Sequence, residues 1–287
     1  MDVLTDLPDS GGDRAPSEGE GPGADDHRYR QRRRAIAAAA EAYRPGEPVP
    51  DVEYTPEEDG VWRLVSSHLA EKHRRLACRE YLEGAARLRL PAHRVPQLRE
   101  VDERVSAITG FRLRPVAGLV PPRQFYGSLA DRTFMSTQYI RHHSTPLYTP
   151  EPDIVHEIIG HANSLASPLF ADLYQKAGAA SLRARDEAAL GFFSRVWWFT
   201  MEFGVVHEDD GLRAYGAGLL SSYGEIDHFR RAEIRPWDIA AMGRTEYDIT
   251  RYQPVLFAAP SLAEAMAELG RFFDRYDDAF YHSRLAA

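Results

Sequence analysis

The chain has little cysteine, no long apolar run and no recognisable leader. Cys78 is the only cysteine among 287 residues, so neither an intramolecular disulfide nor a cysteine-based metal cluster can form, which fits a reducing cytoplasm. No stretch of 18 apolar residues occurs, and the first residues, MDVLTDLPD, lack the basic and apolar regions of a signal peptide. We therefore expect a soluble, cytoplasmic protein that has no membrane partner.

Most of the chain also lacks net charge. The formal charge is −8, but residues 1–26 hold eight acidic residues against Arg14 alone, so the rest is nearly balanced. This balance gives no electrostatic reason to expect a nucleic-acid partner. Five arginines lie between Arg28 and Arg34. Beside an acidic tail and an alanine run, they indicate the start of a solvated helix rather than a nucleic-acid contact.

Composition divides the chain into a tail and one large domain. Residues 1–30 are rich in Gly, Pro, Ser and Asp without a hydrophobic period, which predicts a disordered acidic tail. Residues 31–53 are interpreted as a linker or helical lead-in, and 54–287 as one globular domain. Capping patterns predict a helix from Thr55 and a last helix from Ser261. Strand signals are few, the clearest at 111–114, so the expected fold class is mainly α with minor β.

The run His156-Glu157-Ile158-Ile159-Gly160-His161 contains two possible metal ligands at an unusual spacing. In a regular α-helix an i,i+5 pair lies roughly 140° apart, too far for one metal. A glycine before His161 can end or loosen the helix, so that the second imidazole reaches the first. We expect Thr149-Pro150 to cap the helix that carries His156, with Pro152 still in its first turn.

A third ligand is predicted from the cost of burial. Glu202 lies in the segment 188–203, which is apolar on almost every side and therefore indicates a buried helix. An ionised carboxylate there is costly unless it is paired or bound to a metal. The alternative for Glu202 is a buried salt bridge with Arg195. Two histidines and one carboxylate are the ligands of a non-heme Fe(II) oxygenase, which leaves one face of the metal open.

Two other classes of protein remain open at this point. A zinc hydrolase can use the same three ligands, but a zinc metalloprotease needs H-E-x-x-H with histidines four apart. Here the second histidine comes one residue later. In a non-catalytic interaction protein the histidines would be structural, and metal would not raise the thermal stability.

Several longer stretches resemble the pterin-dependent aromatic amino acid hydroxylases. The likeness runs from about Tyr54 to Phe280 and implies that 54–287 has that family's catalytic-domain fold. It implies Fe(II) as cofactor, a tetrahydropterin and O2 as cosubstrates, and an aromatic amino acid as the small-molecule partner. The stretches are TQYIRHHSTPLYTPEPDIVHEIIGH (137–161), WWFTMEFG (197–204), AYGAGLLSSYGE (214–225), VAGLVPPRQF (116–125) and YQPVLF (252–257).

The resemblance also implies roles for individual residues. His156, His161 and Glu202 match the iron ligands. The residues that match positions around the pterin are Gly118, Leu119, Phe125 and Glu157. Arg141 matches the arginine that grips the substrate carboxylate, a task suited to its planar fork. The other residues that match substrate-binding positions are Thr149, Pro152, Trp198, Ser221 and Glu225.

The resemblance favours L-phenylalanine as substrate and tyrosine as product, because Trp198 and Leu119 match phenylalanine hydroxylases; tryptophan remains an alternative substrate. Met135, His143 and residues 162–164 depart from the usual pattern around the pocket. A phenylalanine 3-hydroxylase that produces meta-tyrosine is therefore a further alternative. We see no regulatory domain before the likeness and no heptad helix after it, and we expect a monomer.

Overall fold

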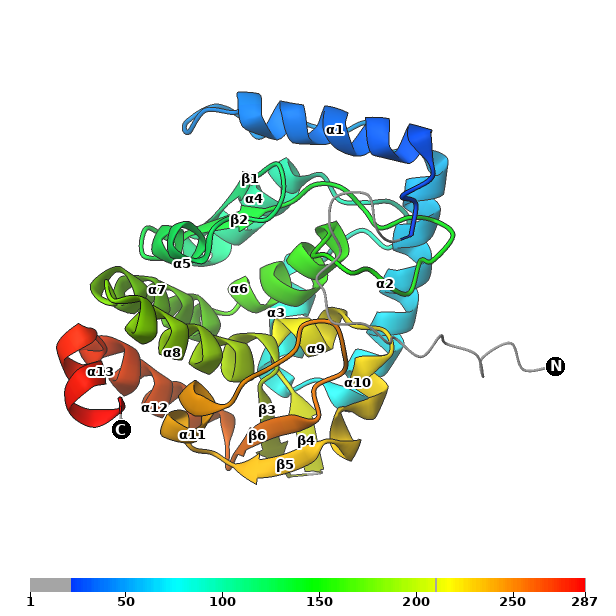
Figure 1. Ribbon diagram of the computed structural model, residues 1–287. Helices are drawn as coiled ribbons and strands as arrows, with labels where there is room; N and C mark the ends of the chain where they lie inside the picture. Colours follow the sequence, from blue (N-terminus) through cyan, green and yellow to red (C-terminus); the bar gives the residue numbers. More distant parts are fainter. Residues whose placement is uncertain (1–21, 210, 287) are drawn as a thin grey trace.

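The described residues are mainly helical, with short strands, as the sequence predicts. The computed structural model describes residues 22–209 and 211–286 (Figure 1). None of the described helices is both long and apolar enough to cross a membrane. The elements of the first half are α1 (His27–Ala42), α2 (Pro56–Leu76), α3 (Arg79–Leu88), α4 (Leu98–Thr109), β1 (Arg112–Pro115), α5 (Pro122–Leu129) and β2 (Thr133–Ser136).

The second half begins with a π-helix, η1 (His156–Ala162), and carries another, η2 (Trp198–Glu202). The α-helices are α6 (Asn163–Leu165), α7 (Pro168–Arg183), α8 (Glu187–Trp197), α9 (Ala217–Ser221), α10 (Glu225–His228), α11 (Ile239–Arg244), α12 (Leu262–Arg275) and α13 (Asp278–Arg284). The strands are β3 (Val205–Glu208), β4 (Gly211–Ala214), β5 (Glu233–Pro236) and β6 (Val255–Ala259), and η3 (Phe229–Arg231) is a short 3-10 helix.

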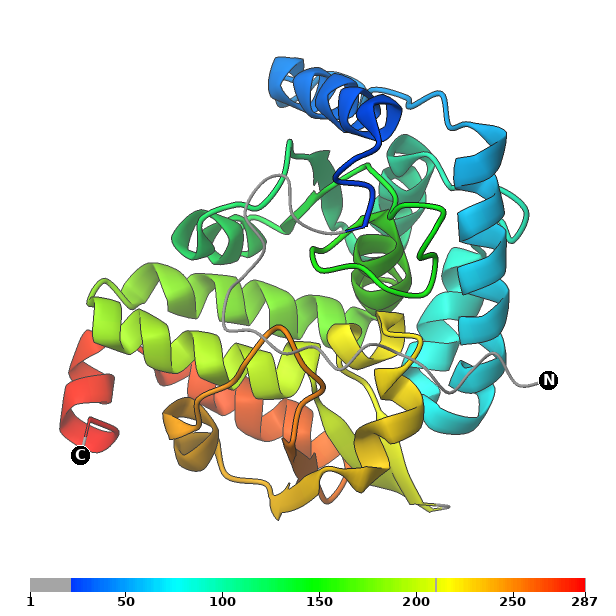
Figure 2. The same ribbon diagram turned by 45° about the vertical axis from the view of Figure 1, so that its right-hand side comes forward.

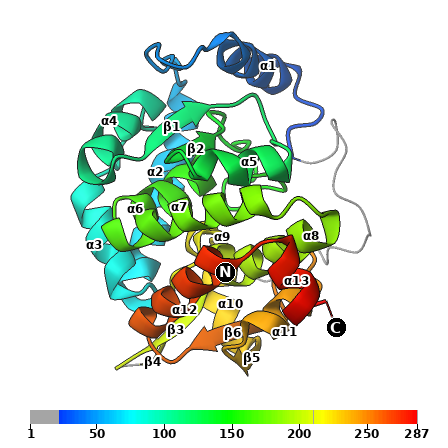
Figure 3. The same cartoon turned by 90° about the vertical axis from the view of Figure 1, so that its left-hand side faces the viewer.

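Helices α7 and α8 run across the middle of the molecule between two small sheets (Figure 3). On one side lie α4, α5 and the parallel pair β1–β2. On the other side lies the sheet β4-β3-β6-β5, in which only the β3–β4 pair is antiparallel among the described strands. The site described below lies where α8 ends, beside η1 and α9.

Local capping rules place two of the helix starts correctly. The Thr55 side chain accepts the amide of Glu58, and the Glu58 carboxylate accepts the amide of Thr55, which completes the predicted capping box of α2. The Ser261 side chain likewise accepts the amide of Glu264 at the start of α12. That helix is not the last one, because α13 follows it.

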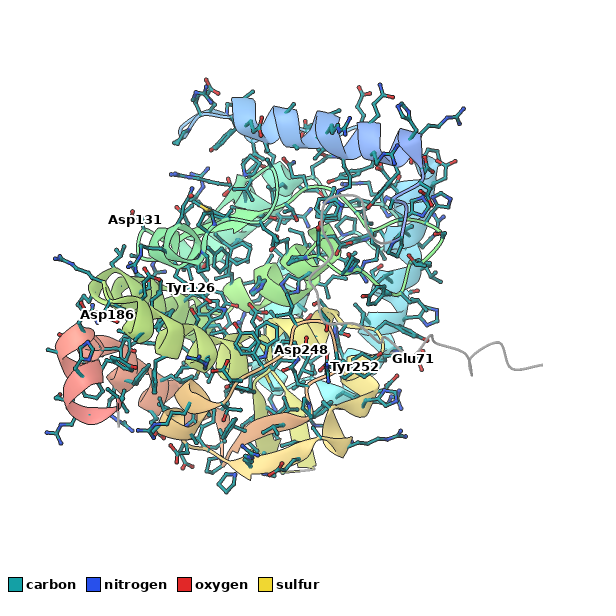
Figure 4. The ribbon with its side chains drawn as sticks, viewed as in Figure 1. Glu71, Tyr126, Asp131, Asp186, Asp248 and Tyr252 are labelled. Atoms are coloured by element: carbon teal, nitrogen blue, oxygen red, sulfur yellow. The ribbon has the colours of Figure 1, made fainter. Side chains whose placement is uncertain are left out.

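The core joins the layers through large aromatic side chains. Trp62, Phe134 and Phe193 have no exposed surface. Tyr126 points from α5 toward α8 (Figure 4), where its ring lies 5.0 Å from that of Phe193 and 5.3 Å from that of Trp197. Such offset and edge contacts fix ring orientation as well as burying area, so the end of α8 is held firmly where the site begins.

The expected tail and the structure differ at residues 22–30. Residues 1–21 lie outside the described part of the chain. Asp26 caps α1 by accepting the amides of Arg28 and Tyr29, at 2.8 and 3.1 Å. Helix α1 therefore begins at His27, within the stretch predicted to be disordered. Its contacts with a distant loop, which residue composition does not show, give it a fixed place.

Candidate active site

The histidine spacing is explained by a π-helix rather than by a helix end. In a π-helix the backbone hydrogen bonds join residues i and i+5, so His156 and His161 lie one above the other in η1. The Asn163 amide donates to the Ile158 carbonyl in this pattern. Gly160 does not end the helix, since η1 continues through Ala162; of the two expectations, an ended or a loosened helix, the wider π turn agrees with the second.

Side chains from outside the backbone ladder stabilise this wider turn. Tyr81 and Asn163 donate to the Ile159 carbonyl, at 2.7 and 3.1 Å. The Ser164 hydroxyl donates to the Gly160 carbonyl at 3.0 Å. Asn163 and Ser164 are expected around the substrate pocket, but both side chains donate hydrogen bonds to backbone carbonyls of η1. Each of these two carbonyl groups thus has a side-chain donor at the wider turn.

Gly160 is required for close packing. A Cβ at this position would lie 2.8 Å from the Ala217 carbonyl oxygen, a distance that real Cβ atoms avoid. The absence of a side chain lets η1 approach α9, which begins at Ala217 and ends at Ser221. This approach brings Ser221 to the first histidine.

Three ligand atoms converge from η1 and η2. The His156 and His161 Nε2 atoms are 3.0 Å apart. Glu202 lies 3.3 Å from His161 Nε2 and 3.8 Å from His156 Nε2 through its two carboxylate oxygens. Among the described residues this is the group of histidines and acids whose potential ligand atoms all lie within 4.8 Å. Arg195, the alternative partner of Glu202, pairs with Glu246 instead.

The Nδ1 atoms of both histidines have hydrogen-bond partners that leave the Nε2 atoms available for a metal ion. The Ser221 hydroxyl donates to the Ala217 carbonyl, so its oxygen is free to accept from His156 Nδ1 at 2.9 Å. His161 Nδ1 lies 2.8 Å from the Tyr174 hydroxyl. With the protons on Nδ1, both Nε2 lone pairs point at Glu202. Partners of this kind fix the tautomer and orientation of metal-binding histidines.

Electrostatics favour the metal-binding forms of His156 and Glu202, whereas the Glu202 carboxylate outweighs burial at His161 and raises its pKa. Burial, helped by His161, lowers the pKa of His156 to about 4. Burial alone would raise the pKa of Glu202, but the neighbouring histidines and the Trp197 indole N–H, 3.1 Å away, lower it to about 2. A neutral imidazole and an ionised carboxylate are the forms that bind a metal.

Replacing Tyr174 with phenylalanine is expected to weaken Fe(II) binding about tenfold to a hundredfold, because His161 loses the partner that fixes its tautomer. Fe(II) titration of the metal-free protein measures the effect. Tyr126→Phe is the matched control, since both tyrosines pack on Trp197, at 5.1 and 5.3 Å between ring centroids. Equal affinities in the two variants would contradict the role assigned to Tyr174.

Arg141 is buried in a two-bond ion pair that sequence reasoning missed. Its Nε and Nη2 atoms donate to the Asp153 carboxylate at 2.9 and 2.8 Å, and its own amide donates to the same group at 2.8 Å. Arg141 and Asp153 are 4% and 0% exposed, so the pair is removed from water. Burial would raise the pKa of Asp153, but the Arg141 charge and hydrogen bonds hold it below its usual value.

Asp153, rather than Thr149, caps the segment that carries the metal ligands. Its carboxylate accepts the amide of His156 at 3.3 Å. The Thr149 hydroxyl instead donates to the Glu151 carbonyl at 2.7 Å. Pro152 lies before the helix rather than in its first turn, and its carbonyl accepts the Tyr139 hydroxyl at 2.7 Å. An aspartate three residues before the bonded amide was the sequence signal for this cap.

Trp198 is held in place by a loop from a distant part of the chain. Its ring stacks on Tyr247, with centroids 4.1 Å apart and planes 9° apart, and its indole N–H donates to the Gln253 side chain at 3.0 Å. The Glu225 carboxylate accepts a hydrogen bond from the backbone N–H of Gln253 at 2.6 Å, and burial raises the pKa of Glu225 to about 7. Asp248 and Tyr252, which are labelled in Figure 4, belong to the same loop between α11 and β6.

The residues expected at the pterin lie at different depths. Glu157 is buried, accepts the Thr137 amide and hydroxyl, each at 3.2 Å, and has a pKa that burial raises to about 7. Phe125 contacts Phe134, whose ring lies 4.7 Å from that of His161, so this position is connected to the metal ligands. Leu119 is 76% exposed in the loop beside Gly118.

The structure also shows where Met135 and His143, two departures from the family pattern, lie. His143 is exposed, and its ring lies 4.2 Å from that of His142, at the outer surface of the loop. Met135 is partly buried in β2, opposite Arg114 of β1. Met135 thus follows Phe134 along β2, whereas His143 faces solvent.

Comparisons with known proteins agree with this geometry. The model of the family described as biopterin-dependent aromatic amino acid hydroxylase matches residues 14–283, starting well before Tyr54 and including α1. Phenylalanine 3-hydroxylase from Streptomyces coeruleorubidus is 49% identical over 84% of this chain and 87% of its own length. Phenylalanine 4-monooxygenase from Pinus taeda is 46% identical over 74% of the chain, but this covers 60% of that protein.

Solved structures give the same answer. Phenylalanine hydroxylase from Chromobacterium violaceum with iron(III) and 7,8-dihydrobiopterin bound matches with a TM-score of 0.74 and 30% identity, over 82% of this chain and 84% of that one. The Colwellia psychrerythraea enzyme matches with a TM-score of 0.71 and 33% identity, over 78% and 90%. The zinc hydrolase and interaction-protein alternatives are therefore excluded. The chain belongs to the biopterin-dependent aromatic amino acid hydroxylase family of iron- and pterin-dependent monooxygenases.

Proposed function

We propose that this enzyme hydroxylates the benzene ring of free L-phenylalanine at ring carbon 3, giving meta-tyrosine. The observation that carries the proposal is the 49% identity to a phenylalanine 3-hydroxylase over 87% of that protein. Hydroxylation at carbon 4, which the sequence resemblance favours, is the second candidate. It is supported by the 46% identity to the phenylalanine 4-monooxygenase of Pinus taeda.

The chain contributes positioning to this reaction. When bound, Fe(II) and tetrahydropterin supply the activation of dioxygen. His156, His161 and Glu202 would hold the iron from one side, which leaves its other positions open. Holding the reacting groups in one geometry and excluding water is the larger part of the protein's contribution in such enzymes.

We assign the binding of the substrate's carboxylate to Arg141. Asp153 occupies the Nε and Nη2 donors along one side of the guanidinium. An arginine has five N–H groups, so the Nη1 pair and the second Nη2 hydrogen remain as an end-on fork. Asp153 thereby fixes the plane in which that fork points. We assign the ring-binding wall to Trp198, held by Tyr247 and Gln253.

The proposal is tested by product analysis. The purified enzyme, loaded with Fe(II), is incubated in air with a tetrahydropterin and, in separate reactions, with phenylalanine, tyrosine or tryptophan. Chromatography against meta- and para-tyrosine standards identifies the product, and we expect meta-tyrosine from phenylalanine as the main one. Para-tyrosine alone would overturn the ring position but keep the substrate. Turnover of tryptophan without turnover of phenylalanine would overturn the substrate.

A further inference from the structure

Helix α1 lies across the loop that carries three of the proposed substrate-binding residues. We call residues 139–152 the substrate loop, because Arg141, Thr149 and Pro152 belong to it. Figure 2 shows the lead-in to α1 (dark blue) passing beside this loop (green), far from it in sequence. The contacts between them fall at both ends of the loop.

Arg33 of α1 holds the far end of the substrate loop. Its Nη2 atom lies 2.7 Å from the Glu151 carboxylate, and its guanidinium lies over the Tyr139 ring, 3.9 Å from the centroid. The Tyr139 hydroxyl donates to the Pro152 carbonyl at 2.7 Å and lies 3.4 Å from the Glu151 carboxylate. One arginine thus contacts both the start and the end of the loop.

Tyr29 and the turn before α1 hold the near end. The Tyr29 hydroxyl donates at 2.9 Å to the carbonyl of Ile140, the residue before Arg141. The Tyr29 ring meets the edge of the His142 ring at 4.9 Å. Gly23 also lies against His142: a Cβ there would come within 2.6 Å of that ring. Contacts therefore lie on both sides of Arg141.

Helix α1 has few attachments other than these. Its buried residues are Ile36 and Ala40. Ile36 belongs to a small cluster with Val52 and Tyr139, separate from the main core, so part of its apolar contact is with the substrate loop as well. Arg32 makes the other strong side-chain contact, an ion pair with Glu58 of α2 at 3.1 Å. The helix is thus fastened between α2 and the substrate loop.

We propose that α1 acts as a clamp on the substrate loop, and that Arg33 and Tyr29 are positioning residues which raise the affinity for the amino acid substrate. The clamp acts through Arg141, so the inference rests on the proposed role of this loop in substrate binding. Neither residue lies at the metal site, so the clamp changes amino acid binding without changing the iron. Exposed ion pairs and cation–π contacts each contribute modestly.

The test compares neighbouring arginines on one helix. Arg33→Met removes the contact with the loop, and Arg32→Met removes a similar ion pair with α2. We expect Arg33→Met to raise the KM for the amino acid about threefold to tenfold. Iron content, the KM for tetrahydropterin and kcat should stay near the wild-type values. Arg32→Met should leave the amino acid KM unchanged, with at most a similar small loss in Tm.

Two further variants separate positioning from general stability. Arg33→Lys keeps the charge beside Glu151 and should recover part of the lost affinity. Tyr29→Phe keeps the ring but removes the bond to the Ile140 carbonyl, and should raise the amino acid KM about twofold to tenfold. The assays use whichever aromatic amino acid the wild-type enzyme hydroxylates, so a wrong substrate assignment does not affect them. The clamp is overturned if Arg33→Met and Arg32→Met give the same KM, or if only the tetrahydropterin KM changes.

Discussion

Replacing Glu202 with alanine is expected to abolish iron binding and hydroxylation together. Glu202 supplies the negative charge of the ligand set, and without it only two neighbouring imidazoles, whose Nε2 atoms are 3.0 Å apart, remain to hold the metal. Metal binding needs the full ligand set, and its free energy is lost when one ligand is removed. Activity should fall by more than the roughly hundredfold effect that loss of an outer partner produces. The measurements are iron per chain after reconstitution and desalting, and turnover.

Glu157→Gln is the matched control for this loss. Glu157 is also a buried carboxyl group and is adjacent to His156, but its bonds go to Thr137. The glutamine variant should keep one iron per chain, whatever happens to its use of tetrahydropterin. His156→Ala and His161→Ala should behave like Glu202→Ala. A Glu202→Ala protein that retains stoichiometric iron and turnover would place the third ligand elsewhere.

The residues of the metal site could be predicted because their chemistry is rare in the sequence. Two histidines five residues apart in an apolar segment, and one carboxylate in an otherwise apolar helix, are costly to bury unless they share a partner such as a metal ion. Local rules also gave the capped starts at Thr55 and Ser261. In these places the signal lies within a few neighbouring residues, which is the range over which capping and periodicity act.

The π-helix could not be predicted in the same way. The i,i+5 spacing showed that a regular helix was impossible, but the wider turn depends on Tyr81, which reaches the Ile159 carbonyl from α3. Likewise, no local pattern connects Tyr174 with His161 or Tyr247 with Trp198. Asp153 is different: its position three residues before His156 is a local cap signal, but the Thr149-Pro150 pattern nearby predicts a competing cap that the structure does not use.

Helix α1 shows the limit of composition as a guide to order. Residues 22–30 are mostly polar, with Tyr29 as their one large apolar side chain, and the composition of the stretch 1–30 predicts that they are disordered. Their order comes from contacts made over a large sequence separation, such as the bond from Tyr29 to the Ile140 carbonyl. A segment with few apolar residues can therefore be fixed by specific polar contacts, whose partners its own sequence does not reveal.

Replacing Arg141 with lysine is expected to raise the KM for the amino acid by at least about tenfold, while iron content and the tetrahydropterin KM stay near wild type. A charge-assisted contact to a carboxylate is worth about 1.5–3 kcal/mol. Lysine keeps the charge, but its single ammonium group cannot bind Asp153 and a substrate carboxylate through two separate pairs of N–H donors, as a guanidinium can. The variant should also lose stability, because the buried Asp153 carboxylate loses part of its hydrogen bonding. Steady-state kinetics and a thermal melt measure the two effects.

Arg112→Lys separates these two effects. Arg112 binds Asp102 through the same Nε and Nη2 donors, at 2.9 and 2.7 Å, and the Leu113 amide donates to that carboxylate just as the Arg141 amide donates to Asp153. Arg112→Lys should therefore lower Tm without changing the amino acid KM. If both lysine variants lower Tm and neither changes that KM, Arg141 is a structural residue only. If Arg141→Lys raises the tetrahydropterin KM instead, Arg141 serves the cofactor and the proposed orientation of the pocket is wrong.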